Sequence, residues 1–284
     1  MDPLAGKYLR PEKWPGTACP GCGLRLLHRE VLTAIDALGL GPSDLVWGTA
    51  IGCTGRQTYA TWRGDTFAGT HGRVYALATG LRLALPREKR ILLTVGDGDA
   101  FTIGLPHLLA AARRNVDLTV VVGDNLGYQS TGGQYGVTTP AGSRTDSSPY
   151  GTWEPGWSDG GLDVLGIVRE AGASFLARHT VLQRDAVVES VKAALGTRGF
   201  SLVQVVYGCH VHYGAQALGD GTVGAIQGWI RARTVPLEPG PAPEVAPAGF
   251  RTGVFHDARG ARPEFTERLR DHVAAVRARA GRTS

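Results

Sequence analysis

Two continuous apolar segments constrain the fold of this chain more than any other feature of its sequence. Residues 90–95 (RILLTV) and 117–122 (DLTVVV) have the composition of strands that are buried on both faces. Residues 100–114, which lie between them, carry apolar side chains at helical spacing. Buried strands that alternate with helices are typical of a parallel sheet with helices on both faces.

The same alternation continues along most of the chain, so we expect an α/β fold built on one parallel sheet. The further helices are expected at residues 24–38, 72–85, 163–171 and 185–195, and the further strands at 45–50, 175–177 and 202–207. A turn is expected at residues 51–55, directly after the first strand. In sheets of this kind, ligands bind at the carboxyl ends of the strands.

Two long segments interrupt the alternation. Residues 126–161 are rich in Gly, Ser, Thr and Pro, and a loop of that length is usually functional or disordered. Residues 235–248 are rich in proline and are expected to be extended, and a charged helix is expected near 263–280. We therefore divide the chain into a main domain, 1–234, and a tail, 235–284, which we expect to contact another subunit.

Composition and charge exclude several classes of protein. Of the 284 residues, 43% are hydrophobic and 19% are charged, as in ordinary globular proteins. We find neither an apolar run long enough to cross a membrane nor a secretory signal, so we expect a cytoplasmic protein without a membrane partner. The net charge of +5 comes without any Lys/Arg block or nucleic-acid motif. It suits an acidic electron carrier or an anionic cofactor rather than nucleic acid.

Four cysteines suggest redox or metal chemistry. Cys19 and Cys22 form a C-x-x-C motif, whereas Cys53 and Cys209 are far away in the sequence. Disulfides are rare in a cytosolic chain, which leaves a redox thiol pair, a structural zinc site or an iron–sulfur cluster. A thioredoxin-like motif requires a strand before its first cysteine, and no convincing strand precedes Cys19. A structural zinc site usually has a second close pair of Cys or His ligands, and Cys53 and Cys209 do not form one. Ligands scattered along the sequence suit an iron–sulfur cluster best, but the spacing alone leaves the thiol pair, the zinc site and the cluster as open alternatives.

Polar residues at two expected strand ends suggest a site for a phosphate and a metal ion. The strand at 90–95 ends in Gly96-Asp97-Gly98-Asp99, and the strand at 117–122 is followed by Asp124 and Asn125. Glycine backbone can face a phosphate, but a carboxylate beside that phosphate requires a divalent cation between them. Because neighbouring strands lie about 4.8 Å apart, Asn125 can reach the same ion as Asp97. Alternatively, Asp97 is only a helix cap and Asn125 only a turn residue.

Several motifs in fixed order resemble one family. They are CPGCG at 19–23, IGC at 51–53, HGR…ATG at 71–80, GDGDA at 96–100, and DN-x-x-Y…TGGQY at 124–135. Together they resemble the β subunit of 2-oxoacid:ferredoxin oxidoreductases, which bind thiamine diphosphate. The resemblance is close over residues 17–140 and loose elsewhere.

The resemblance implies a set of site residues. Cys19, Cys22, Cys53 and Cys209 would hold one [4Fe–4S] cluster, and Asp97, Asn125 and the carbonyl of Gly127 would hold Mg²⁺. The residues that would line thiamine diphosphate are Ile51, Gly52, Cys53, Thr54, His71, Gly72, Arg73, Gly96, Gly98, Asp99, Gln129 and Ser130. Arg56 falls where the family has a basic residue near the substrate carboxylate or coenzyme A, so Arg56 and His71 are the catalytic candidates.

This chain also departs from the family pattern. Asp124 replaces a common asparagine, and Gly127, Gln129 and Ser130 replace the residues usual at their positions. Cys209 lies in the sequence YGCHVH, which differs from the usual proline-rich surroundings of the fourth cysteine. The neighbouring histidines, His210 and His212, are expected to pack or to form hydrogen bonds rather than to bind metal.

The resemblance implies an activity that this chain cannot complete alone. The enzyme would convert a 2-oxoacid and coenzyme A to acyl-CoA and CO₂, and it would pass electrons through the cluster to ferredoxin. A separate α subunit would carry the pyrimidine-binding domain, in an αβ or (αβ)₂ assembly. Arg56 favours 2-oxoglutarate or a broad substrate range, with a pyruvate-specific enzyme as an alternative. Outside this activity, the alternatives are a non-redox thiamine-diphosphate decarboxylase or synthase subunit and a non-enzymatic electron-transfer or scaffold subunit.

Overall fold

An eight-stranded sheet forms the centre of the molecule. The computed structural model describes residues 3–159, 161–237 and 249–280. Its strand order is β2-β1-β3-β4-β6-β5-β8-β7. The strands are β1 (Leu45–Thr49), β2 (Thr66–Ala68), β3 (Arg90–Gly96), β4 (Leu118–Asp124), β5 (Phe175–Thr180), β6 (Phe200–Val206), β7 (Thr234–Pro236) and β8 (Phe250–Asp257). Strands β1 to β6 pair in parallel, while β8 joins β5 in antiparallel orientation.

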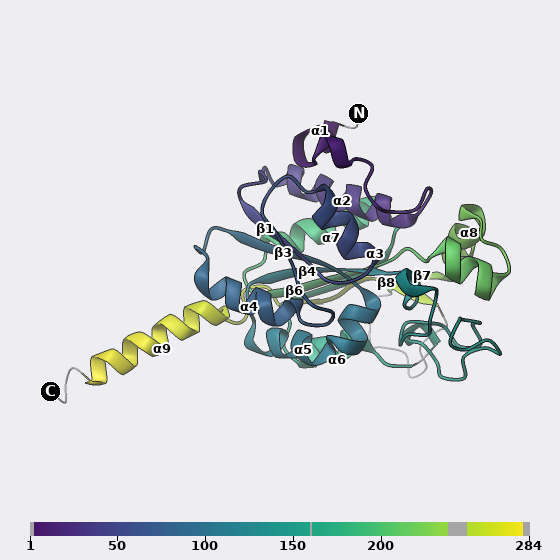
Figure 1. The fold of residues 1–284 in the computed structure, drawn as a ribbon. Helices are drawn as coiled ribbons and strands as arrows, with labels where there is room; N and C mark the ends of the chain where they lie inside the picture. Colours follow the sequence, from purple (N-terminus) through teal and green to yellow (C-terminus); the bar gives the residue numbers. More distant parts are fainter. Residues whose placement is uncertain (1–2, 160, 238–248, 281–284) are drawn as a thin grey trace.

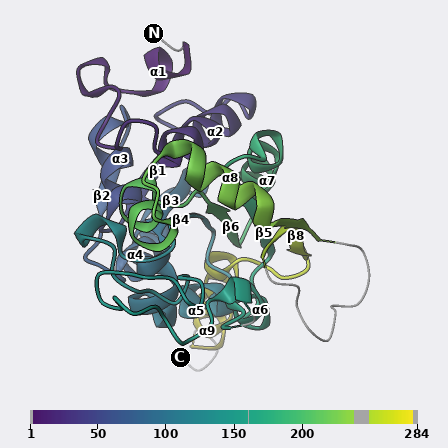
Figure 2. The ribbon, with the colours of Figure 1, turned by 90° about the vertical axis from the view of Figure 1, so that its right-hand side faces the viewer.

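Helices cover both faces of the sheet, as the sequence predicts (Figures 1 and 2). One face carries α1 (Pro3–Tyr8), α2 (Gly23–Ala37), α3 (Cys53–Thr61) and α7 (Arg184–Gly196); the other carries α4 (Val74–Ala84), α5 (Leu105–Arg114) and α6 (Val164–Glu170). Helix α2 packs on the sheet through its periodic apolar side chains. The buried side chains on this face are Leu24, Leu27, Val31 and Ile35. The predicted α/β fold is thus confirmed.

Two expected elements differ from those in the structure. Residues 53–55 are not a turn but the first turn of α3, because Gly52 reverses the chain at φ 113° and the helix begins at Cys53. The helix expected at 100–114 is interrupted. A π-helical turn spans Asp99–Ile103, and α5 begins after Gly104. Pro106 lacks the N–H that a continuous helix would need at that position.

The long loop and the segment after β6 contain structure that the sequence pattern does not predict. Within the loop, 3₁₀ turns lie at Gln129–Thr131 and Trp157–Asp159. A π-helix (η5, His210–Leu218) and helix α8 (Val223–Arg233) follow β6. Most of the expected proline-rich segment, 238–248, lies outside the described residues. The charged helix near the end is present as α9 (Phe265–Ala280).

The sheet brings the expected site residues to one edge. Strands β3 and β4 align Gly96 with Gly123, so Asp97 and Asn125 leave the sheet from neighbouring strands. Figure 2 looks onto this carboxyl edge, where η5 and α8 cross in front of the strand ends. Among the described residues, no helix combines the length and apolarity needed to cross a bilayer.

Candidate cofactor pocket and four-cysteine pocket

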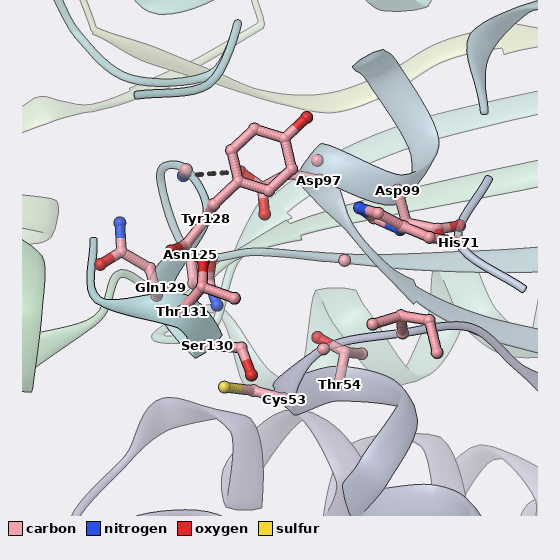
Figure 3. A pocket seen from close by; sticks show the side chains of 15 residues that line it. Cys53, Thr54, His71, Asp97, Asp99, Asn125, Tyr128, Gln129, Ser130 and Thr131 are labelled. Atoms are coloured by element: carbon pink, nitrogen blue, oxygen red, sulfur yellow. Dashed lines mark hydrogen bonds and ion pairs between the residues drawn. The ribbon is translucent and has the colours of Figure 1, made fainter. Parts of the chain in front are cut away.

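A pocket opens at the carboxyl ends of β1, β3 and β4 (Figure 3). It is lined by Ile51, Gly52, Cys53, Thr54, His71, Gly96, Asp97, Gly98, Asp99, Asn125, Gly127, Tyr128, Gln129, Ser130 and Thr131. All the expected thiamine-diphosphate residues are among them except Gly72 and Arg73. Gly72 lies just behind His71, while Arg73 is exposed at the start of α4.

Three oxygen atoms converge at the floor of this pocket. The side-chain oxygen of Asn125 lies 3.1 Å from Asp97 Oδ1 and 2.9 Å from the carbonyl oxygen of Gly127, while its Nδ2 donates to Tyr207 Oη at 3.0 Å. With the amide turned over, its nitrogen would instead donate to the same two oxygens. Mg²⁺ binds oxygen at about 2.1 Å in octahedral geometry, which places adjacent ligands about 3.0 Å apart. The oxygens therefore have the spacing of neighbouring Mg²⁺ ligands, and the donor set fits this ion.

The second oxygen of Asp97 fixes the orientation of its carboxylate. Asp97 Oδ2 accepts from the backbone N–H of Gly127 at 2.8 Å and from the hydroxyl of Thr138. Burial raises the pKa of Asp97. A bound cation would offset that effect because it favours the charged carboxylate. Thr138 lies in the long loop beyond the TGGQY motif, and no sequence motif indicated its contact with the site.

A buried network holds the loop that carries Asn125 and Gly127. Leu126, between them, has φ 73°, a conformation that is costly for a branched side chain. Its N–H donates to Asp124 Oδ1 at 3.0 Å. Asp124 Oδ2 accepts from Gln204 Nε2 at 2.7 Å and from Trp157 Nε1 at 3.1 Å. Asp124, the departure from the family asparagine, therefore supports the loop from behind and does not line the pocket.

His71 and Asp99 form the side wall of the pocket. His71 Nδ1 lies 2.6 Å from Asp99 Oδ1, which also accepts from the N–H of Gly72 at 2.7 Å. Burial raises the pKa of Asp99. Gly72 has φ 74°, and a Cβ there would lie 2.8 Å from the backbone of Ile103. Gly72 thus allows the loop to approach the π-helical turn closely enough for this contact.

A second pocket adjoins the first and contains all four cysteines. Besides them it is lined by Thr17, Ala18, Leu24, Arg56, Asn125, Gln129, Ser130, Tyr207, His210, Val211 and His212. Cys53 and three of these residues, Asn125, Gln129 and Ser130, also line the first pocket. Arg56 therefore lies at the cysteine pocket, on exposed α3 surface one turn after Cys53, and not at the lining of the cofactor pocket.

The four thiols line one pocket but do not converge on the position of a single metal ion. Burial raises the pKa of Cys22 to about 12, and it also raises the pKa values of Cys53 and Cys209. The charges of the other cysteines add to each of these shifts. Within the described part of the chain, no three His, Cys, Asp or Glu side chains meet closely enough for a single metal ion. The Cys209 sulfur accepts from the N–H of His212 at 3.4 Å.

Gln57 fixes the segment that precedes Cys19. This side chain is fully buried on α3. Its Oε1 accepts from the N–H groups of Thr17 (2.9 Å) and Ala18 (3.0 Å), and its Nε2 donates to the carbonyl of Pro15 at 3.1 Å. Sequence reasoning missed Gln57, and it also missed the other supporting residues, Tyr128, Thr131, Thr138 and Tyr207. Tyr128 and Thr131 had a local signal, since they belong to the D-N-x-x-Y and T-G-G-Q-Y motifs, whereas Gln57, Thr138 and Tyr207 had none.

This chain is similar in sequence to a thiamine pyrophosphate domain family and to subunits of 2-oxoglutarate synthases. Residues 43–205 match the model of the C-terminal TPP-binding domain of thiamine pyrophosphate enzymes. The 2-oxoglutarate synthase subunit KorB of Archaeoglobus fulgidus is 40% identical over 206 residues, which are 72% of this chain and 74% of that protein. The KorB subunit of Methanocaldococcus jannaschii is 36% identical over 208 residues, 73% of this chain and 74% of that protein.

A solved structure is similar over nearly the whole chain. It is the 2-oxoglutarate:ferredoxin oxidoreductase of Magnetococcus marinus with 2-oxoglutarate, coenzyme A and succinyl-CoA bound. It superposes with a TM-score of 0.81 at 26% identity, and the superposition covers 99% of this chain and 92% of that chain.

Proposed function

Since the chain belongs to the family of 2-oxoacid:ferredoxin oxidoreductase β subunits, we propose that it binds thiamine diphosphate, Mg²⁺ and one [4Fe–4S] cluster in such an enzyme. The enzyme would oxidatively decarboxylate a 2-oxoacid with coenzyme A and pass the electrons to ferredoxin. The observation that carries this proposal is the shared wall of the two pockets. Cys53 lines both, so a cofactor in one and a cluster in the other would be immediate neighbours.

The proposed cofactor site divides into a metal-binding part and a wall. Asp97, Asn125 and the Gly127 carbonyl would hold Mg²⁺, which would offset the negative charge of the diphosphate. At Gly98 a Cβ would lie 2.5 Å from the ring of Tyr128, so glycine keeps the backbone close to that ring. His71, oriented through Nδ1 by Asp99, would hold its ring toward the bound group.

The proposed cluster site uses the four cysteines. The N-terminal arm supplies Cys19 and Cys22, α3 supplies Cys53, and the start of η5 supplies Cys209. The N–H of His212 would donate to the Cys209 sulfur, and such hydrogen bonds tune the reduction potential of a cluster.

When bound, thiamine diphosphate would supply an electron sink for decarboxylation, and the cluster would take up the electrons singly. The protein's own residues contribute position and polarity. Gln129 lies between the pockets, and its Nε2 donates to the carbonyl of Leu126 at 3.1 Å. Gln129 Oε1 and Asp99 Oδ2 are buried without a partner among the described residues, so both are free to receive a hydrogen bond from a ligand.

We propose 2-oxoglutarate as the substrate. Two similar KorB proteins are named 2-oxoglutarate synthase subunits, and the Magnetococcus marinus enzyme binds 2-oxoglutarate. Arg56 lines the cysteine pocket and not the cofactor pocket, but the two pockets share Cys53 and Ser130. We therefore expect Arg56 to receive the second carboxylate from the adjoining pocket, because a guanidinium binds a carboxylate through two parallel hydrogen bonds. Arg56→Ala should raise KM for 2-oxoglutarate more than KM for the monocarboxylate 2-oxobutyrate. Equal changes in KM would contradict this role.

The partners follow from what the chain contains. The matched domain is the TPP-binding domain of its class, so a separate α subunit would supply the pyrimidine-binding domain. Acidic ferredoxin suits the net charge of +5. We expect the purified chain alone to have negligible turnover and the co-expressed complex to reduce ferredoxin with 2-oxoglutarate and coenzyme A. Release of an aldehyde without ferredoxin reduction would instead support a non-redox decarboxylase.

A further inference from the structure

The C-terminal helix α9 has an unusual position. All of its 16 residues are at least partly exposed. Its base contacts the segments that precede β3 and β4, so it leaves the molecule at the amino ends of the strands, opposite the cofactor pocket. Figure 1 shows it in yellow, projecting away from the body. Most of the stability of helices in proteins comes from packing of an amphipathic face, so packing against another surface would stabilise the outer turns of α9.

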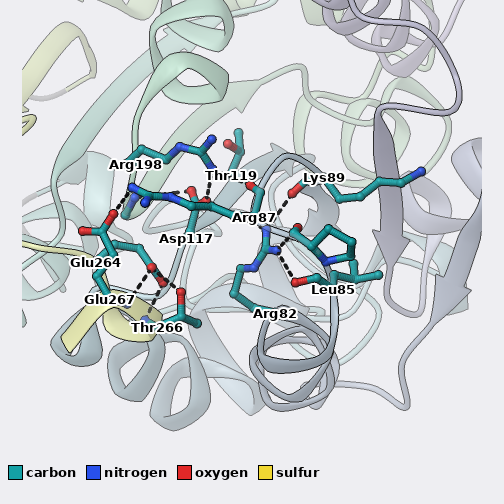
Figure 4. Close-up of polar contacts among 12 residues, drawn as sticks. Arg82, Leu85, Arg87, Lys89, Asp117, Thr119, Arg198, Glu264, Thr266 and Glu267 are labelled. Carbon is teal, nitrogen blue, oxygen red and sulfur yellow. Dashed lines mark hydrogen bonds and ion pairs between the residues drawn. The ribbon is translucent and has the colours of Figure 1, made fainter. Parts of the chain in front are cut away.

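The base of α9 is firmly attached (Figure 4). The carboxylate of Glu264 accepts from the N–H groups of Thr266 at 2.7 Å and Glu267 at 3.2 Å, which caps the helix. Arg268 Nη2 donates to the carbonyl of Arg114 at 2.6 Å, and Glu267 forms an ion pair with Arg87. These contacts fix the direction in which the helix leaves the domain.

The outer part of α9 carries an apolar stripe. Phe265, Leu269, Val273 and Val276 follow one another at intervals of four, four and three residues, so they share one side of the helix. Leu269 and Val273 are each 38% exposed, and Val276 is 49% exposed. Apolar side chains on a projecting helix indicate a surface for a partner.

The charges of α9 are arranged around this stripe. At 100° per residue, Arg270 and Arg277 flank it on one side and Arg268 and Arg279 on the other. The acidic residues, Glu267 and Asp271, lie on the opposite side of the helix. Both flanks of the stripe are therefore basic.

The stripe continues onto the body of the domain. Leu269 also lines a groove at the base of α9, together with Leu83, Leu85 and Pro86 from the end of α4. Leu83 is 51% exposed. Two exposed arginines, Arg87 and Arg270, lie at the sides of the groove, and Arg87 is paired with Glu267. Arg82 also lines the groove, but it is buried and donates to the carbonyls of Lys89 and Leu85. We call the groove and the stripe together the α9 strip: Leu83, Leu85, Leu269, Val273 and Val276.

We propose that the α9 strip binds an amphipathic helix of the partner subunit whose apolar face is flanked by acidic residues. This inference rests on the proposed function only in that the chain works with another subunit. A narrow apolar stripe on a helix fits the face of a second helix, and basic flanks require acidic ones opposite. A second copy of this chain would place arginine against arginine, so charge disfavours self-association through the strip.

The test compares two neighbouring positions in the full chain. Val273→Glu places a charge within the strip, and Ala274→Glu places the same charge on the opposite side of α9. We expect Val273→Glu to weaken binding to the partner subunit at least tenfold in calorimetric titration, and Ala274→Glu less than twofold. Arg277→Glu combined with Arg279→Glu should also weaken binding and should reduce its dependence on salt. Equal affinities for the Val273 and Ala274 variants would overturn the proposal.

Two further measurements distinguish other occupants. Binding of the wild-type chain to phosphatidylserine vesicles that Val273→Glu abolishes would overturn the proposal in favour of a membrane surface. A concentration-dependent dimer that Val273→Glu dissociates would overturn it in favour of a second copy. The strip lies at the edge opposite both pockets, so iron content and thiamine-diphosphate binding should be the same in the wild type and both variants. Their absence from all three proteins would refute the proposed function and leave the docking result standing.

Discussion

The role of Gln57 gives the sharpest test of how the cysteine pocket is built. Replacement by leucine keeps the size of the side chain but removes two acceptor contacts and one donor contact. The N–H of Ala18 is buried and would remain unpaired, at a cost of about 1–3 kcal/mol. Thr17 and Pro15 are exposed and can turn to water, so each loses about 0.5–1 kcal/mol. In total, the free energy needed to detach the arm that carries Cys19 from α3 would fall by about 3 kcal/mol.

A loosening of that size raises the open population of the arm by about two orders of magnitude, since 1.4 kcal/mol corresponds to tenfold. The proposed cluster should therefore lose iron to a chelator far faster in Gln57→Leu than in the wild type, as followed by visible absorbance under anaerobic conditions. Thiamine-diphosphate binding should change little, because Gln57 does not line that pocket. Gly16→Ala gives an independent perturbation, since its Cβ would lie 2.4 Å from the amide of Gln57.

The control is Gln227→Leu, which makes the same chemical change on α8, away from the cysteine pocket. The reasoning is refuted if Gln57→Leu loses iron at the wild-type rate. It is also refuted if Gln227→Leu accelerates the loss equally.

Three further predictions concern the metal site, its support and acid stability. Asp97→Asn should weaken Mg²⁺-dependent binding of thiamine diphosphate at least tenfold in calorimetry, because the ion loses its only carboxylate ligand from the proposed set; unchanged affinity would count against that set. Asp124→Asn should weaken Mg²⁺ binding by a smaller factor and lower Tm, because an amide has only one accepting oxygen: in either orientation, the Leu126 N–H or the pair Gln204 and Trp157 loses its acceptor, and an unchanged Tm would argue against the network. Burial lowers the pKa of His28 from 6.5 to about 4. The neutral imidazole therefore contributes its full stabilisation above pH 6.5, and up to about 3 kcal/mol of the free energy of unfolding is lost as the pH falls toward 4. His28→Phe should keep the contact with Trp47 and flatten the fall in Tm between pH 6.5 and 4.5, whereas an equally steep fall would contradict this assignment.

The strand ends are predictable from sequence because their signals are local. Apolar runs indicate buried strands, and polar residues directly after two such runs must meet at one edge of a parallel sheet. That reasoning predicts that Asp97 and Asn125 lie side by side, and their oxygens are indeed within 3.1 Å of each other.

The supporting residues were not predictable, because their signals are not local. Gln57 and Thr138 act on segments 40 and 41 residues away in the chain, and their sequence surroundings are ordinary. The start of α3 at Cys53 was missed for a related reason. The glycines on either side of Cys53 suggest a turn, but Gly52 alone makes the turn, and Gly55 is needed inside the helix, where a Cβ would meet the carbonyl of Ala50 at 1.9 Å.

The elements after β6 escaped prediction because tertiary packing selects them. The segment His210–Leu218 has a weak apolar pattern, and its π-helix places the side chain of Tyr213 in the interior of the protein. Tyr213 packs against Trp229 of α8, which in turn contacts Phe250 of β8. This cluster joins residues distant in the sequence and fixes the position of Cys209. Neither feature could be deduced from the sequence YGCHVH alone.

The central claim is that the four cysteines hold a redox cluster beside the cofactor pocket. Iron and acid-labile sulfide, measured on the anaerobically purified full chain, test it most directly. Our account predicts about four of each per chain, the content of one [4Fe–4S] cluster, and a loss of both in Cys53→Ser. A chain that holds no iron after anaerobic reconstitution, while it still binds thiamine diphosphate with Mg²⁺, would contradict the account and favour a non-redox enzyme.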